Sequence, residues 1–440
     1  MIKHYDGVLG TFDYDDEMFE VVYREDLNPS CNPVEYFHYI GDGKVELPNG
    51  CINTNRMFYG CCLPEGFTLG DKFDTSKVEN MAGMFGYCKL PEGFSFGDNF
   101  NTGSVKSMNG MFFGCEMSEG FTLGDKFDTS NVECMSEMFC DCKMPEGFTL
   151  GEKFDTSSVH DMRKMFRLCE MSEGFTLGDK FNTRSVENMK SMFMECMIPE
   201  GFTLGDKFDT SNVECMSEMF CDYKLPEGFT LGEKFNTGCV TDMSSMFFNC
   251  EIPEGFTLGD KFDTSKVKNM RNMFFKCKML EGFTLGDKFD TSNVECMLNM
   301  FCGCRMLEGF TLGDKFDTSK VKNMRNMFFK CRMPEGFTLG DKFDTSRVED
   351  MSYMLYDCEL PKGFSLGDKF DISKVKNMSG MFERCELPIG FSFGDKFDTS
   401  GIEDTDGMFS ECRLSKGFTP DDSLDLSKFK ELAQLLGKGV

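Results

Sequence analysis

The sequence has no tryptophan, only 3 histidines, and no apolar run near the roughly 20 residues needed to cross a bilayer. Cationic side chains are also in the minority, because 47 Lys and Arg stand against 74 Asp and Glu, for a net charge of -27. A chain this acidic repels the phosphates of nucleic acids and the surface of anionic membranes. These absences argue against nucleic-acid binding and against membrane insertion.

The N-terminus has no continuous apolar stretch before its first acidic residues, so the chain as written is expected to carry no secretory signal. That expectation favours the cytoplasm or an unconventional route of export. Hydrophobic residues make up 40% of the chain, with 50 Phe and 36 Met, which is ample material for a buried core. We therefore expect a folded protein.

The dominant feature of the sequence is a repeat of 27 residues. The pair Gly-Phe recurs at this spacing from Gly66 to Gly417, giving 13 complete units, and Met57 and Cys61 place one degenerate unit before them. A fixed period over many units predicts a solenoid, in which each unit buries its apolar face against its neighbours. We expect a β-rich N-terminal cap over residues 1–48, a solenoid over 49–416 and a C-terminal capping segment over 417–440. The last segment is expected to contain a helix with Ser427 as its cap and Gly437 as its stop.

Two periodicities occur within each unit. Phe67 and Leu69 alternate with a polar residue, which predicts a short strand. The run from Val78 to Cys88 places apolar residues at steps of three and four, which predicts a helix, with Asp74 as a capping residue. The expected fold class is an α/β repeat solenoid with one short parallel strand and one short helix per coil.

The segments "FDTSNVECMSEMFCDC" and "FNTGCVTDMSSMFFNC" carry a resemblance to a known family. They resemble the MF-x-x-C repeat of BspA-like, leucine-rich-repeat-related surface proteins, also called the DUF285 repeat, over about residues 50–416. The resemblance implies a leucine-rich-repeat-like solenoid for adhesion or protein interaction, often displayed at bacterial or other microbial surfaces, and it implies no enzyme. Tyr223, Leu355 and Thr405 depart from the pattern.

Most of the 23 cysteines form one column at the repeat spacing. Stacked cysteines lie within disulfide range, but each would have two equivalent neighbours, so we favour a reduced ladder of buried thiols. The "CDC" and "CGC" segments suggest a thiolate metal site only weakly, since their spacing and the lack of a fourth ligand do not suit zinc. No metal and no cofactor is expected. The ladder residues are Cys88, Cys115, Cys142, Cys169, Cys196, Cys250, Cys277, Cys304, Cys331, Cys358 and Cys385.

Polar residues recur as columns, without the convergent set of unlike groups that a catalytic site needs, so we expect no enzyme. The column that contains Gly86 varies from unit to unit and becomes phenylalanine in several units. In two units, "VKNMRNMFFKC" joins this phenylalanine to cations, which suits a partner-binding site because Arg and aromatic residues concentrate binding energy. The alternative is that the phenylalanine covers a groove between neighbouring helices. The candidate residues are Lys268, Arg271, Phe275, Lys276, Lys322, Arg325, Phe329 and Lys330.

The leading hypothesis is a non-enzymatic protein that binds a protein or glycan through an extended surface of repeated sites. The same 22 residues occur at 120–141 and 201–222, and such repetition favours multivalent binding. One alternative is a structural role, in which the uniform column of Thr68 and its flanking glycines packs against a regular surface. A less favoured alternative is a rod that responds to thiol oxidation or to metal.

Overall fold

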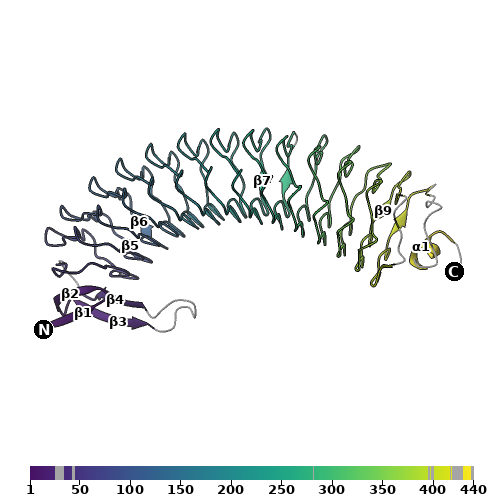
Figure 1. Ribbon diagram of the computed structural model, residues 1–440. Helices are drawn as coiled ribbons and strands as arrows, with labels where there is room; N and C mark the ends of the chain where they lie inside the picture. Colours follow the sequence, from purple (N-terminus) through teal and green to yellow (C-terminus); the bar gives the residue numbers. More distant parts are fainter. Residues whose placement is uncertain are drawn as a thin grey trace. The chain divides into compact units, whose positions relative to one another are not determined.

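The computed structural model describes residues 1–24, 34–41, 45–280, 282–394, 397, 401–416, 418 and 430–437 (Figure 1). Their contacts divide the chain into two compact units, residues 1–212 and residues 213–440. The boundary falls inside the regular repeats, so each unit contains its own stack of 27-residue coils. We name each column of equivalent positions by a residue of the first regular coil, for example the Cys88 column.

The N-terminal segment of the first unit forms two antiparallel hairpins. Strand β1 (Ile2–Gly7) pairs with β2 (Gly10–Asp15), and β3 (Phe19–Arg24) pairs with β4 (Val34–Tyr39). Their aromatic side chains form a common core, in which the rings of Phe19 and Phe37 stack with centroids 4.3 Å apart. The Tyr39 amide donates to the Met57 carbonyl at 2.8 Å, which joins the hairpins to the first coil.

Successive coils in each unit pair in parallel, with each bridged residue opposite its equivalent 27 positions later. The Asn80 column forms single bridges such as Asn80 with Ser107 and Asn269 with Cys296. A second ladder runs along the Lys89 column, directly after the Cys88 column, and in places forms two-residue parallel strands. These are β5 (Lys89–Leu90) with β6 (Glu116–Met117), β7 (Glu251–Ile252) with β8 (Lys278–Met279), and β9 (Glu386–Leu387) with β10 (Arg413–Leu414).

The helix predicted in each coil is not formed. From the Met81 column to the Cys88 column the chain makes consecutive turns, whose amides bond alternately within the coil and to the next coil. The Phe275 amide donates to the Asn272 carbonyl at 3.0 Å, whereas the Phe274 amide donates to the Met300 carbonyl of the next coil at 2.9 Å. In a helix, every amide would bond to a carbonyl of its own segment. Here alternate amides bond to the next coil, and these inter-coil hydrogen bonds take the place of a helix.

The strand predicted at Phe67–Leu69 pairs with the next coil only near the ends of the array. Among the described residues, the Thr68 column is bridged at Thr68 with Ser95 and at Ser365 with Ser392. The rings of neighbouring coils lie further apart in the Phe73 column, close to this strand, than in the Phe85 column. The Phe262 and Phe289 rings of the Phe73 column lie 6.5 Å apart, whereas Phe274 and Phe301 of the Phe85 column lie 5.6 Å apart.

The interior of each coil is filled by columns of Phe, Val, Met, Leu and Cys, which are buried almost without exception. One buried column is polar. The Thr75 column is fully buried, and most of its hydroxyls donate to a backbone carbonyl of the next coil, as Thr264 does to Asp290 at 2.8 Å. Most of these threonines therefore fill the core with the methyl group and satisfy a backbone carbonyl of the next coil with the hydroxyl.

At the C-terminus, α1 (Lys430–Leu435) buries Leu432 and Ala433. The turn after it ends at Gly437, whose φ of +65° suits the glycine predicted as a helix stop. The predicted cap, Ser427, lies outside the described residues. In the part of the chain that the structure describes, no helix has the length and apolarity to span a membrane.

Candidate partner-binding surface

The predicted candidates lie on the turn segment of each coil, defined as the eleven residues from the Glu79 column to the Lys89 column, such as 268–278 and 322–332. Its shape comes from two left-handed residues. Asn272 and Lys276 have φ of +57° and +56°, and Asn326 and Lys330 have +56° and +55°. Asparagine visits this region readily, whereas lysine is strained there. The strain is sustained because the amide of each lysine bonds to the next coil.

Asparagine side chains fix the register of these turns. Asn299 Nδ2 donates to Asn272 Oδ1 at 2.8 Å, and Asn326 Nδ2 donates to Asn299 Oδ1 at 2.9 Å. This amide ladder joins three successive coils beside the candidate residues. These hydrogen bonds hold the three turn segments in register, and the longer side chains extend from them.

Arg271 and Arg325 follow identical local turns. The amide of Arg271 donates to Asn269 Oδ1 at 3.1 Å, and that of Arg325 donates to Asn323 Oδ1 at 3.0 Å. Both arginines are exposed, and neither forms an ion pair among the described residues. Their guanidinium groups are therefore available to a partner.

The phenylalanines of the candidate clusters are half-buried and stack on a neighbouring coil. The Phe275 ring lies 4.7 Å from Phe248, and the Phe329 ring lies 4.5 Å from Tyr356, both nearly parallel. This stacking is similar to the alternative interpretation, in which the phenylalanine covers a groove between neighbouring helices, except that the neighbouring segments are turns. One part of each ring packs, and the remaining part stays open to a partner.

Cations lie over these aromatic rings. Lys276 Nζ is 5.5 Å from the Phe275 centroid, and Lys330 Nζ is 5.7 Å from that of Phe329 and 5.9 Å from that of Tyr356. Such contacts contribute about 0.5–1 kcal/mol at exposed sites. Each cluster thus combines an aromatic platform with a positioned ammonium group.

The remaining two candidates lie at the start of the turn segments. Lys268 and Lys322 are exposed, and Lys322 forms a loose ion pair with Glu295 at 3.8 Å. The predicted residues of each cluster thus lie within one turn segment, with the coil of 295–305 between the two clusters.

Sequence reasoning missed three further cations on the same face: Lys278, Arg305 and Arg332, which are successive members of the Lys89 column. The signal was available, because this column mostly alternates between Lys or Arg and Glu, and three successive cations break the alternation. Lys278 pairs with Glu251 at 2.8 Å and Arg332 with Glu359 at 2.9 Å. Arg305 forms no ion pair among the described residues.

The Cys88 column is buried, and all cysteines that the structure describes are free thiols. Most ladder thiols donate to a carbonyl of the preceding coil, as Cys88 does to Phe58 at 2.6 Å and Cys250 to Phe220 at 2.7 Å. Burial raises the pKa of the Cys88 thiol to about 12. A thiol with so high a pKa is a poor nucleophile and a poor metal ligand at neutral pH.

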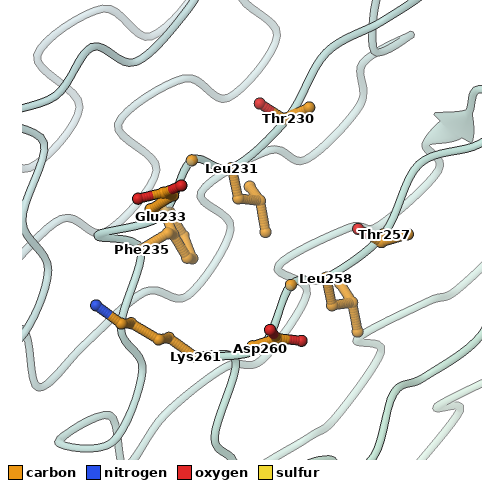
Figure 2. Close-up of a pocket in the computed structure, with 10 residues that line it drawn as sticks. Thr230, Leu231, Glu233, Phe235, Thr257, Leu258, Asp260 and Lys261 are labelled. Atoms are coloured by element: carbon orange, nitrogen blue, oxygen red, sulfur yellow. The ribbon is translucent and has the colours of Figure 1, made fainter.

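Within the described ranges, no group of three His, Cys, Asp or Glu side chains is arranged to hold a metal ion. Shallow clefts open instead on the Thr68 side of the coils. Figure 2 shows one of about 520 Å³, where Thr230, Leu231 and Glu233 lie beside Thr257, Leu258 and Asp260, their equivalents in the next coil. The cleft repeats one set of side chains and does not gather unlike catalytic groups.

Comparison with known proteins gives one family. The model of the family described as "Mycoplasma protein of unknown function, DUF285" matches residues 52–171, 116–224, 146–253, 200–305, 230–336, 254–360 and 339–436. These overlapping matches cover nearly the whole repeat region. No curated protein and no solved structure matches the chain.

Proposed function

Since this chain belongs to the DUF285 family of Mycoplasma proteins of unknown function, we propose that it is a non-enzymatic repeat protein that binds a protein or glycan partner, with adhesion as its biological role. Its stacked coils act as a solenoid whose turn segments form the binding surface. The Thr68 side is uniform from coil to coil, whereas the turn segments vary and can distinguish partners.

One observation carries this proposal: the cluster of cations around a half-buried aromatic ring occurs twice, in equivalent turn segments two coils apart. Arg271 and Arg325 are exposed and have no ion pair among the described residues, and Phe275 and Phe329 are positioned by stacking. Arginine and aromatic side chains dominate binding energy at interfaces. Two equivalent sites on one rigid surface add avidity when the partner has repeated features.

The test is capture of partners by the full chain from cell lysates, compared with the variant Arg271→Glu/Phe275→Ser/Arg325→Glu/Phe329→Ser. Circular dichroism must first show equal folding, and an arginine-only variant covers the case in which the phenylalanine changes unfold the coil. The matched control is Lys288→Glu/Lys342→Glu, which reverses two exposed charges on the Thr68 side of the same unit. Partners retained by the wild type and control but lost from both turn-segment variants support the proposal.

A second candidate role is packing of the Thr68 side against a regular surface. The exposed threonines and the open clefts between coils favour it, because they present one chemistry at a regular spacing (Figure 2). Partners that persist in the turn-segment variants and are lost from the Lys288→Glu/Lys342→Glu variant would favour this role and contradict the leading proposal.

A further inference from the structure

The turn segments of three consecutive coils form a strongly basic surface on an acidic protein. We call the segments 268–278, 295–305 and 322–332 the cationic island. Together they contain nine Lys and Arg and a single carboxylate, that of Glu295. In the whole chain the balance is reversed, with 47 cations against 74 anions. The island therefore carries a local positive charge, opposite in sign to the net charge of the chain.

More than half of the island's cations form no ion pair among the described residues. The ones in ion pairs are Lys278, Lys322, Lys330 and Arg332, and three of these four pair outward with carboxylates of flanking coils. The cations without an ion pair among the described residues are Lys268, Arg271, Lys276, Arg305 and Arg325. All of the latter are exposed.

The flanking coils limit the size of an anionic partner. The turn segment 241–251 has two carboxylates and no cation, and the segment 349–359 has four carboxylates and no cation. Neighbouring coils lie about 4.8 Å apart at a parallel bridge, which is within the Debye length of about 8 Å at physiological salt. A long polyanion lying along the stack would meet repulsion on both sides of the island.

The middle coil leaves space between the two aromatic clusters. Gly303 occupies the position held by Lys276 and Lys330 in the coils on either side. A Cβ at Gly303 would lie 3.1 Å from Lys276 Cγ, so the missing side chain lets the stem of Lys276 lie across this coil.

We propose that the cationic island binds a short acidic segment of a partner protein, in extended conformation, through Arg271 and Arg325, with Arg305 adding to the positive charge of the surface. This inference rests on the proposed function and specifies the chemistry of its partner. Arg271 and Arg325 lie two coil spacings apart, about 10 Å, which three residues of extended chain span. Guanidinium groups bind carboxylates in bidentate geometry, and the open parts of the Phe275 and Phe329 rings take an apolar residue beside the acidic ones.

The test is fluorescence anisotropy of a labelled hexaglutamate peptide with the full chain at low and near-physiological salt. The wild type is expected to bind it, with an affinity that falls as salt rises. Arg271→Glu/Arg325→Glu should weaken binding about 100-fold, because two charge-assisted contacts are replaced by repulsion. Arg305→Glu should weaken it in the same direction, and Lys288→Glu/Lys342→Glu should leave it unchanged.

Three results would overturn the inference: no binding by the wild type, equal loss in the Lys288→Glu/Lys342→Glu control, or tighter binding of a sulfated oligosaccharide through the same arginines. The proposed function is judged separately. If a captured partner requires Arg271 and Arg325 while hexaglutamate does not bind, the acidic-segment inference fails and the proposed function stands. If neither the captured partners nor the peptide depends on these arginines, both fail.

Discussion

The buried Thr75 column allows a sharp test of what holds neighbouring coils together. Thr264 is fully buried, and its hydroxyl donates to the Asp290 carbonyl of the next coil at 2.8 Å. Thr264→Val keeps the shape and volume of the side chain and removes the donor. A buried polar group left without a partner costs about 1–3 kcal/mol. Because Asp290 is only half-buried, the free energy of unfolding should fall by about 1 kcal/mol, at the low end of this range.

The measurement is urea denaturation followed by circular dichroism, with the midpoint and slope compared between variants. Repeat arrays can unfold in more than one step, so the comparison requires an unchanged slope. Thr257→Val is the matched control, because Thr257 belongs to the same coil but is exposed, and such a change alters stability by less than about 0.5 kcal/mol. Thr264→Ser keeps the donor and loses a methyl group worth about 1 kcal/mol.

Thr257→Val is expected to be the most stable of the three variants, with Thr264→Ser and Thr264→Val destabilised by similar amounts. If Thr264→Val were as stable as the wild type, the hydroxyl would contribute nothing and the apolar columns alone would hold the coils in register. The chain contains one natural counterpart, since Ile372 occupies the same buried column near the C-terminal end of the array.

Three further predictions follow from the burial and hydrogen bonding of single columns. Alkylation of the native chain near neutral pH should modify the exposed Cys62 and spare Cys88, because burial raises the pKa of the Cys88 thiol to about 12. Equal rates of modification, detected by mass spectrometry, would contradict a buried cysteine ladder. The Ser76 amide helps to hold the pKa of Asp74 below 3.8, and the pKa of Asp263 is also lowered, so their contribution to stability is present above that pH and lost as the pH falls below it. Asp74→Asn/Asp263→Asn should therefore lose less stability than the wild type between pH 7 and pH 3 in urea titrations, and an equal loss would count against the turns as the acid-sensitive element. Phe274→Ala should lower the free energy of unfolding by about 3–5 kcal/mol, because the ring is fully buried between rings of both neighbouring coils; a loss below 1 kcal/mol in the same assay would show that the stacked rings are dispensable.

The repeat register and the buried columns could be predicted from the sequence because burial recurs at a fixed interval. The local conformation could not, since steps of three and four residues suit a helix and also a series of turns. A signal that favours turns was present. The left-handed columns contain Gly83 and Gly110 in one and Asn249 and Gly303 in the other, and Gly and Asn are the residues that adopt positive φ most readily. Helical spacing concealed this signal.

The candidate surface was predictable in part. The two clusters stand out in the sequence because Arg, Lys and Phe repeat there together. Arg305 does not stand out, because its own coil contains no cluster and it joins the surface only through its neighbours at 278 and 332. A residue whose role depends on adjacent coils is found by aligning columns as well as by searching along the chain.

The in-register pairing of successive coils within each unit has a genetic consequence. The segments 120–141 and 201–222 are identical and lie 81 residues apart, which is three whole coils. Unequal recombination between their coding sequences would delete or add three coils and leave the junction with the same inter-coil hydrogen bonds as before. The gene can thus vary the length of its product in whole coils, which changes the number of coils between the N-terminal hairpins and the cationic island while preserving both.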